Sequence, residues 1–355
     1  MTKRIKILFT IPNFNTAGSQ YVVKTLVSRM DTLLFEPYVG VESAADLIPN
    51  IVPPDYKLLL PTKEKGLKAV LKFRQLLKKH HIDIVHSWDY KSHATEVLAS
   101  RLAGVAYVFT KKNNSWSKAW IFKSLLANHI AYDNPLMQKR FFDALYVRNK
   151  VTFIPHGVDV DLFQAAPTHD KTNFSLCSIG EINSNKNQLF ILKALLDLPH
   201  EVQVCFYGRE EFAYKAQLMT FINAHNLIER VHFKGYIANE SIPVVLNQHD
   251  VFVLASKHEG MPVSILEALA CGLPVLSSDS GGGSRYIIDT TKGGFLFSLE
   301  TTDELVKQVM DLKQNPELYR EVSEAATRNT RKRFNIQKEV DAYKSLYLKC
   351  VHAEV

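Results

Sequence analysis

The stretch from Asp250 to Asp279 constrains the fold most, because it has the pattern of a strand, a tight turn, a helix and a second strand. An apolar run ends at Leu254, and the turn Gly260-Met-Pro262 follows shortly after it. Proline suits the first turn of a helix, where its missing N–H costs nothing, and glycine lets the backbone approach a neighbouring group closely. Strand and helix patterns of this kind alternate along the whole chain, which predicts an α/β protein with parallel sheets.

The length of 355 residues suggests about two domains. We expect a first domain of residues 1–165, a second of residues 166–335 and a C-terminal helix in 336–355. The strands expected from apolar runs are 5–10, 37–41, 82–86, 106–110, 151–154, 174–179, 202–207, 231–233, 250–254, 274–277 and 294–297. The helices expected from apolar periodicity are 19–30, 67–79, 92–102, 118–127, 188–196, 212–225, 242–248, 263–270, 303–312, 316–331 and 337–350.

The composition is that of an ordinary globular protein, with 46% hydrophobic and 22% charged residues. No apolar run reaches the roughly 18 residues of a membrane span, and the short N-terminal run, interrupted by Lys6, fits a buried strand better than a signal peptide. The four cysteines are scattered without a CxxC pair, which argues against a disulfide framework or a zinc site. We therefore expect a cytoplasmic protein.

The net charge of +7 is unevenly placed along the chain. Residues 1–165 hold 23 Lys and Arg against 13 Asp and Glu, whereas residues 166–355 hold 20 against 23. Such asymmetry favours contact of the first half with something anionic, although solvated surface lysines would give the same count. The acidic balance of the second half argues against a nucleic-acid-binding protein.

Two carboxylates mark the helix expected at 263–270. Glu259 lies just before it and Glu267 about one turn inside it, with seven residues between the two. The first N–H groups of a helix have no intrahelical partner and form a ready anion site. Carboxylates that accept sugar hydroxyls, placed around such a helix start, predict a nucleotide-sugar site.

The string from Glu259-Gly-Met-Pro through Glu267-Ala-Leu-Ala-Cys-Gly-Leu-Pro-Val to Ser280-Gly-Gly resembles the spaced-glutamate signature of retaining glycosyltransferases, closest to glycosyltransferase family 4. The resemblance covers nearly the whole chain and is weakest before Asp31. It implies the GT-B architecture: two doubly wound, Rossmann-like domains that face a cleft. The first would bind the acceptor, the second the sugar donor, and the last helix would cross back to the first domain.

The resemblance also implies roles for individual donor-site residues. Lys186 would stabilise the leaving group, Glu259 would hold the donor sugar and support charge at the reacting carbon, and Glu267 would bind ribose hydroxyls. The other donor-binding candidates contribute mainly backbone around the diphosphate and the base, and they are Gly18, Gly180, Tyr236, Ile237, Gly260, Met261, Pro262 and Val263.

One position departs from the family pattern. Relatives usually have an arginine after Gly180 that grips the diphosphate, whereas this chain has Glu181. A carboxylate would repel that group, so Lys186 must do more, or Arg209 or Arg285 must supply the missing cation.

The acceptor-side candidates follow predicted strands of the first domain, and they are His86, Asp89, Lys111 and Asn113. Many relatives have a histidine near the position of Lys111. A lysine there can contact phosphate or a polar acceptor, but it can act as a base at neutral pH only if its pKa is strongly lowered.

We expect neither a metal ion nor a cofactor. Asp159-Val-Asp161 matches the DxD motif of metal-dependent transferases only superficially, because it falls in the predicted linker between the domains. Lys186 and helix N–H groups would meet the charge of the diphosphate instead.

Two stretches of the first domain suit an anionic bilayer. The helix expected at 67–79 gathers Lys68, Lys72, Gln75 and Lys79 on one face, and Trp116 and Trp120 fall four residues apart near further lysines. Basic and aromatic surface of this kind favours peripheral association with the inner face of a membrane, while packing of each helix on its own domain is the alternative.

The sequence therefore predicts a metal-independent, retaining glycosyltransferase of the hexosyltransferase type. It would use a nucleoside diphosphate sugar, a UDP-sugar first, and a saccharide or lipid-linked acceptor, in polysaccharide or glycolipid assembly. Two alternatives remain: a nucleotide-sugar 2-epimerase on a similar fold, and a non-catalytic relative that only binds the nucleotide sugar.

Overall fold

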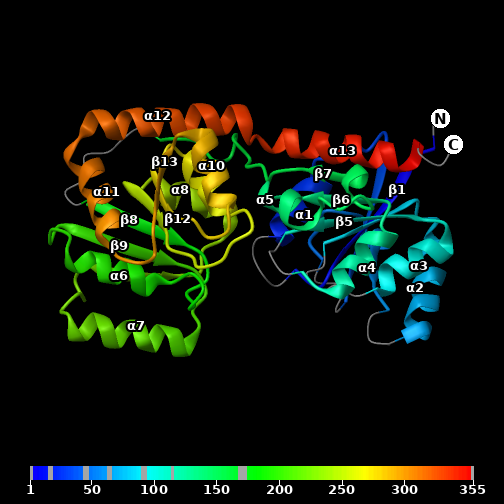
Figure 1. Cartoon of the computed structure of the whole chain (residues 1–355), viewed down its shortest axis with the longest axis horizontal. Helices are drawn as coiled ribbons and strands as arrows, with labels where there is room; N and C mark the ends of the chain where they lie inside the picture. Colours follow the sequence, from blue (N-terminus) through cyan, green and yellow to red (C-terminus); the bar gives the residue numbers. More distant parts are fainter. Residues whose placement is uncertain are drawn as a thin grey trace. The chain divides into compact units, whose positions relative to one another are not determined.

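The computed structural model describes residues 3–14, 19–42, 48–61, 66–88, 94–112, 116–166 and 174–352. The chain divides into two compact units (Figure 1): residues 1–156 with 337–355, and residues 157–336. Each unit is built on a parallel sheet with helices, so the predicted α/β class with two doubly wound units is confirmed.

The first unit contains a seven-stranded parallel sheet in the order β3-β2-β1-β4-β5-β6-β7. Its strands are β1 (Ile5–Ile11), β2 (Phe35–Val41), β3 (Lys57–Leu59), β4 (Ile84–Ser87), β5 (Ala106–Lys111), β6 (His129–Tyr132) and β7 (Val151–Phe153). Its helices are α1 (Ser19–Ser28), α2 (Gly66–His80), α3 (Thr95–Ala103), α4 (Lys118–Leu126), α5 (Leu136–Phe141) and α13 (Ile336–His352), whose first residue is the last of the second unit.

The second unit contains a six-stranded parallel sheet in the order β10-β9-β8-β11-β12-β13. Its strands are β8 (Phe174–Ile179), β9 (Val202–Tyr207), β10 (Val231–Gly235), β11 (Val251–Leu254), β12 (Val275–Ser278) and β13 (Gly294–Phe297). Its helices are α6 (Gln188–Leu196), α7 (Phe212–Ala224), α8 (Ile242–Leu246), α9 (Val263–Ala270), α10 (Gly283–Thr291), α11 (Asp303–Gln314) and α12 (Pro316–Arg333). The strand order reverses between β8 and β11, and ligands of doubly wound sheets bind at such a switch point.

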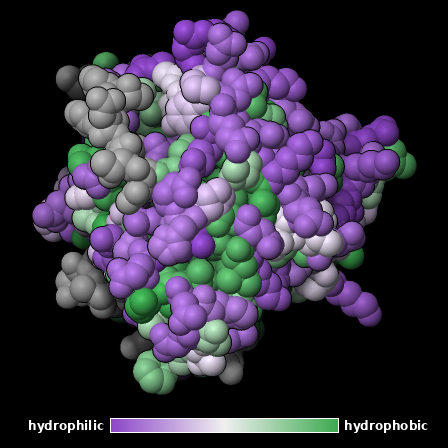
Figure 2. All heavy atoms as spheres, turned by 90° about the vertical axis from the view of Figure 1, so that its left-hand side faces the viewer, coloured by the Kyte–Doolittle hydropathy of each residue, from purple (hydrophilic) through white to green (hydrophobic). Residues whose placement is uncertain are grey.

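Two apolar clusters, one with residues of α9 and α10 and the other with residues of α6, α7 and α11, form the core of the second unit. Hydrophilic residues cover most of the face shown in Figure 2, and apolar side chains gather in its lower half, the side of α6 and α7 in Figure 1. Leu196 of α6 and Phe212 of α7 are exposed. The predicted site, in contrast, belongs to the loops at the strand ends.

The boundary between the units lies after His156 and not at residue 165. Residues 157–166 belong to the second unit because Val158 pairs with Asn335 and Phe163 is buried in a cluster with residues of α9. Of the strands and α-helices in the described residues, β3, β6, α5 and α10 were not predicted. A strand of four residues that begins with histidine, and a helix that begins with glycine, give little local signal.

Helix α13 is part of the core of the first unit. The rings of Tyr343 and Tyr347 are fully buried and stack at 6.0 Å between centroids. The Tyr347 hydroxyl lies 2.6 Å from Nδ1 of His86, and the Tyr343 hydroxyl lies 3.0 Å from Oγ1 of Thr110. Because these partners come from β4 and β5, the last helix is fastened directly to the middle of the sheet.

A buried ionic triad fastens α13 at its first turn. Nδ1 of His156 lies 3.1 Å from Oε1 of Glu339, and Nε2 lies 3.3 Å from Oδ2 of Asp133. Burial lowers the pKa of His156, but the two carboxylates outweigh burial and raise the pKa to about 10. The imidazolium therefore contributes one positive charge between two buried carboxylates where the chain leaves the first unit.

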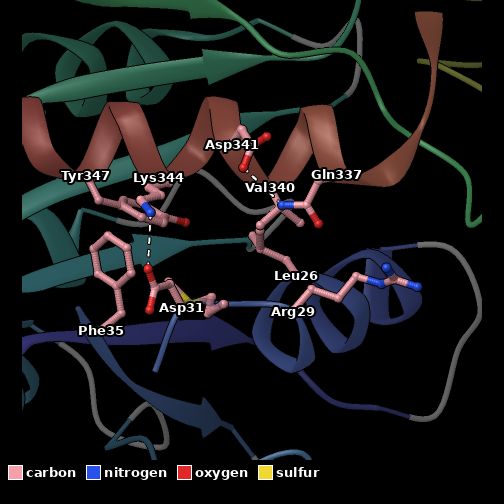
Figure 3. Close-up of a pocket in the computed structure, with 10 residues that line it drawn as sticks. Leu26, Arg29, Asp31, Phe35, Gln337, Val340, Asp341, Lys344 and Tyr347 are labelled. Carbon is pink, nitrogen blue, oxygen red and sulfur yellow. Dashed lines mark hydrogen bonds and ion pairs between the residues drawn. The ribbon is translucent and has the colours of Figure 1, made fainter. Parts of the chain in front are cut away.

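A cavity of ≈ 190 Å³ lies between α1, the start of β2 and α13 (Figure 3). Leu26, Val340 and Tyr347 are buried in its wall, and the ion pair between Asp31 and Lys344 crosses its rim at 3.1 Å. Because Phe35 opens β2, the cavity lies at the amino ends of the strands. Doubly wound sheets bind their ligands at the opposite edge, so we do not assign this cavity to the functional site.

We predict that His156→Ala lowers the free energy of unfolding by about 3 kcal/mol, because it removes the charged group that two buried carboxylates share. The stability that His156 contributes is fully present below its unfolded pKa of about 6.5 and is lost as the pH rises toward 10. Between pH 7 and 9, the free energy of unfolding measured with urea should therefore fall more steeply with pH in the wild type than in His156→Ala, by up to about 1.4 kcal/mol per pH unit.

His200→Ala serves as the matched control, because His200 is exposed at the end of the loop before β9. Equal slopes for the wild type and His156→Ala would contradict a charged, buried His156.

Candidate functional site

The candidate site is built from two loops of the second unit that leave neighbouring strands. The loop after β8 carries residues 180–187, and the loop after β11 carries residues 255–262. The backbone N–H of Lys257 donates to the carbonyl of Asn185 at 2.8 Å, and the side-chain amide of Asn185 donates to the carbonyl of His258 at 3.1 Å. The parallel pairing of β8 with β11 places the loops side by side, and Asn185 joins them.

Lys186 and Glu259 face each other across this junction. Nζ of Lys186 lies 2.7 Å from Oε1 of Glu259, and the side chains are 21% and 18% exposed. Both groups are accessible enough to reach a ligand, yet recessed enough for their charges to act strongly on it. The sequence placed them 73 residues apart, and the fold brings them into contact.

Glycines are required where the loops at the carboxyl ends of the strands contact each other through their backbones. A Cβ atom on Gly208 would lie 1.8 Å from the carbonyl oxygen of Gly180, and one on Gly283 would lie 1.9 Å from the carbonyl oxygen of Gly260. Gly180 also has a positive φ of 149°, and a Cβ there would meet the side chain of Lys186. The loops after β8, β9, β11 and β12 therefore pack backbone against backbone.

Helix α9 begins directly beside Glu259. Pro262 precedes it with extended backbone, Met261 is buried, and the first turn starts at Val263. The backbone N–H of Glu259 donates to the carbonyl of Ser280 at 2.7 Å, which fixes the approach to the helix. The N–H of Ile265 donates to the carbonyl of Pro262 at 3.2 Å, so an anion at this end of α9 would be met by the N–H groups that precede Ile265 and by the helix dipole.

Glu267 lies one turn further along α9 and is half-buried. Burial raises the pKa of its carboxyl to about 7. Ionised, the carboxylate would accept hydrogen bonds from two hydroxyl groups, and a ligand that supplies them would offset the cost of burying the charge. Together with Lys186 and the start of α9, it suits a ligand that carries both phosphate and hydroxyl groups.

The two arginines proposed as substitutes for the missing cation have other contacts. Arg285 pairs with Asp279 at 2.8 Å on the loop after β12. The guanidinium of Arg209 lies 5.2 Å from the ring centre of Tyr236, and its backbone carbonyl accepts from Ile182 in the β8 loop at 2.8 Å. The backbone of Arg209 therefore contacts the loop of Lys186 directly.

Tyr236 and Ile237 follow β10 at the same edge of the sheet. Tyr236 is 55% exposed, so its ring is available to a ligand, whereas Ile237 is half-buried against the core. Three other predicted residues, Gly18, Asp89 and Asn113, lie outside the residues that the structure describes.

The two described acceptor-side residues are buried in the first unit. His86 has no exposed surface, contacts Tyr347 and Thr110 through its two nitrogens, and has a pKa lowered well below the usual value, first by burial and then by Lys112. Burial likewise lowers the pKa of Lys111 to about 7, with Nζ 4.4 Å from the ring centre of Trp120. The expectation that both lie open to an acceptor is therefore not supported.

The predicted aromatic surface around Trp120 is also wrong. Trp120 and Lys123 are buried, with the ammonium of Lys123 5.0 Å from the Trp120 ring centre. Trp116 stacks on Phe141 at 4.8 Å between centroids. Trp120 packs inward because α4 turns this face toward Phe109 of β5, and the large apolar residues of α4 that are exposed are Phe122 and Leu125.

Among the residues that the structure describes, no group of three or more His, Cys, Asp or Glu side chains could hold a metal ion. Within the same residues, no helix is long and apolar enough to cross a membrane. All four cysteines are buried, and none of them forms a disulfide bond.

Sequence reasoning missed the asparagines of the β8 loop. Asn183 and Asn185 connect Lys186 to its own loop and to the loop of Glu259. The signal was present in the polar run Asn183-Ser-Asn-Lys-Asn187, because asparagine side chains frequently hydrogen-bond the backbone two or three residues on.

Two family models match this chain in succession. The model described as Glycosyltransferase Family 4 matches residues 16–162, and the model described as Glycosyl transferases group 1 matches residues 159–329. Together they span both units.

Individual relatives agree with these matches. The UDP-Gal:alpha-D-GlcNAc-diphosphoundecaprenol alpha-1,3-galactosyltransferase of Escherichia coli is 27% identical over 332 residues, covering 81% of this chain and 80% of the relative. The putative glycosyltransferase EpsF of Bacillus subtilis is 28% identical over 318 residues, covering 78% of this chain and 79% of EpsF. The crystal structure of HepE from Anabaena in complex with UDP has a TM-score of 0.85 at 19% identity, covering 97% of this chain and all (100%) of HepE, which shows a shared fold.

Proposed function

This chain belongs to the group 1 and family 4 glycosyltransferases, and from that premise we propose that it transfers a sugar from a nucleoside diphosphate sugar to a hydroxyl group of its acceptor. The single observation that supports the donor class most strongly is the pair of Lys186 and Glu259 beside the start of α9. One cation, one helix start and two carboxylates meet there. The cation and the helix start can bind a diphosphate, and the two carboxylates can accept hydrogen bonds from the hydroxyl groups of a sugar and a ribose.

The donor must displace one contact on arrival. Lys186 cannot serve the diphosphate fully while its ammonium holds Glu259 at 2.7 Å. When Lys186 turns to the phosphate, the carboxylate of Glu259 is released toward the sugar, where it can support positive charge at the reacting carbon. The ion pair of Lys186 with Glu259 thus keeps both groups positioned and gives each charge a partner.

We propose UDP-sugars as the first donor class. Support comes from the E. coli relative, whose name specifies UDP-Gal, and from HepE, whose structure contains UDP. The same relative is named for an acceptor sugar on diphosphoundecaprenol, and EpsF and EpsD of B. subtilis are named as putative glycosyltransferases. A saccharide or lipid-linked saccharide in polysaccharide or glycolipid assembly is therefore the proposed acceptor.

Retention of anomeric configuration without a metal is part of the same proposal. It rests on the resemblance of the two spaced glutamates to retaining enzymes and on the positive groups already available, Lys186 and the start of α9. In this scheme the leaving phosphate takes the proton of the acceptor hydroxyl, so no side-chain base is required. The burial of His86 argues against the epimerase alternative, because an epimerase would need accessible acid and base groups near the sugar.

We further propose that α2 contacts an anionic membrane surface. This helix exposes four lysines, which are Lys68, Lys72, Lys78 and Lys79. Leu67 at its start is 70% exposed. The opposite side packs into the unit through Val70, Phe73 and Leu77. Lysines combined with exposed leucine suit a peripheral contact with acidic lipid headgroups.

The donor proposal predicts that UDP binds the wild type in the presence of EDTA, and that Lys186→Ala weakens this binding at least about tenfold, or about 1.4 kcal/mol. The loss should be confined to the diphosphate, so weak binding of uridine should be unchanged. Titration calorimetry with UDP, GDP, ADP and uridine measures both effects.

Lys193→Ala is the matched control, because Lys193 is an exposed lysine on α6. Failure of the wild type to bind any of the three diphosphates would contradict the proposed function.

The membrane proposal predicts that the protein sediments with vesicles containing phosphatidylglycerol and much less with phosphatidylcholine alone. Each lysine near such a surface contributes about 1 kcal/mol, so replacing Lys68, Lys72 and Lys79 with glutamine should weaken binding about a hundredfold. Replacing Lys193, Lys307 and Arg320 of the second unit with glutamine removes the same charge elsewhere. Equal losses in the two triple variants would contradict a specific role for α2.

A further inference from the structure

Glu181 is tied to its own loop through both its side chain and its backbone. Oε2 of Glu181 accepts a hydrogen bond from Nδ2 of Asn183 at 3.0 Å. Its backbone carbonyl accepts one from the side-chain amide of the buried Gln188 at 3.0 Å. The carboxylate itself is exposed, and the ammonium of Lys186 faces Glu259.

The carboxylate of Glu181 determines how Asn183 is oriented. An ionised carboxylate can only accept hydrogen bonds, so the NH₂ end of the asparagine amide must face it and the oxygen must face away. That oxygen, Oδ1, accepts the backbone N–H groups of Asn185 at 3.1 Å and Lys186 at 2.9 Å. A hydrogen bond to a charged acceptor also polarises the amide and strengthens the bonds on its other side.

The backbone that Asn183 holds is the one that positions the donor-site cation. The N–H of Asn187, a residue with a positive φ of 55°, closes the same turn onto the carbonyl of Asn183 at 3.1 Å. Asn185 is joined to the loop of Glu259, and Lys186 extends from between these two fixed points. A change at Asn183 would therefore move the ammonium relative to Glu259 and to the start of α9.

We propose that Glu181 is a positioning residue, which acts through Asn183 to hold Lys186 where the donor diphosphate binds. This inference rests on the proposed function of the same loop. It assigns a purpose to the carboxylate at the position where related enzymes usually have an arginine. The exposed charge of Glu181 is screened by water and salt, whereas the hydrogen-bonded orientation of Asn183 is local and persists at high salt.

The test compares binding of UDP and uridine by titration calorimetry. Glu181→Ala removes the acceptor of Asn183, and we expect UDP to bind about tenfold more weakly with no change for uridine. Glu181→Gln keeps an acceptor oxygen for Asn183 without the charge, so it should bind UDP within about threefold of the wild type. Asn183→Ala should match Glu181→Ala, and the double variant should be no weaker than either single variant.

Glu211→Ala is the matched control, because it removes an exposed carboxylate from the neighbouring loop after β9 and should leave UDP binding unchanged. If Glu181 only repels the diphosphate, both the Ala and the Gln variant will bind UDP more tightly than the wild type, and the inference is overturned. Unchanged binding in Glu181→Ala overturns it as well. Absence of UDP, GDP and ADP binding in the wild type would instead remove the proposed function and this inference together.

Discussion

The pairing of β8 with β11 is the constraint on which the candidate site depends. From β8 the sheet extends to one side through β9 and β10, and from β11 it extends to the other side through β12 and β13. The loops that follow β8 and β11 therefore meet at the carboxyl ends of these two strands without a helix between them. The loop after β8 supplies Lys186 and the loop after β11 supplies Glu259. Glycines at 180, 208 and 283 let the surrounding loops approach one another closely. The sheet topology and a few glycines therefore bring the side chains of the site together.

Polar groups in the first unit have a different function, which is to hold α13 to the sheet. Tyr343 and Tyr347 bring hydroxyl groups into the core, and His86 and Thr110 accept or donate to them. His156 adds a charge between Asp133 and Glu339. Every one of these contacts joins residues far apart in the chain, so the C-terminal segment cannot be removed without exposing buried polar groups in the middle of the sheet.

The elements of this fold could be predicted from the sequence where the apolar pattern was long or strong. Buried strands such as 174–179 and 202–207 were predicted with their observed bounds, and so was α9. The candidate site could be predicted in part, because Glu259, Glu267 and Lys186 lie in a distinctive local pattern at the ends of such strands. Their geometry could not, since it depends on contacts across 73 residues.

The failures have one physical cause. His86 and Lys111 lie near the ends of strands, as the candidate site residues do, but Tyr347 and Trp120 cover them. No local pattern indicates a partner that is 261 residues away, as Tyr347 is from His86. Trp116 and Trp120 show helical spacing that fits a surface or a core equally well, and only the packing of α4 decides between them. The domain boundary lies after residue 156 and not at the predicted residue 165, because Val158 pairs with Asn335, which is another long-range contact.

The most direct measurement of the central claim is a crystal structure of the protein with UDP. The account predicts that the diphosphate lies at the start of α9, that Nζ of Lys186 has turned from Glu259 to a phosphate oxygen, and that Glu267 accepts hydrogen bonds from the ribose hydroxyls. A nucleotide bound elsewhere, for example in the cavity beside α13, with the 2.7 Å pair of Lys186 and Glu259 intact, would contradict it.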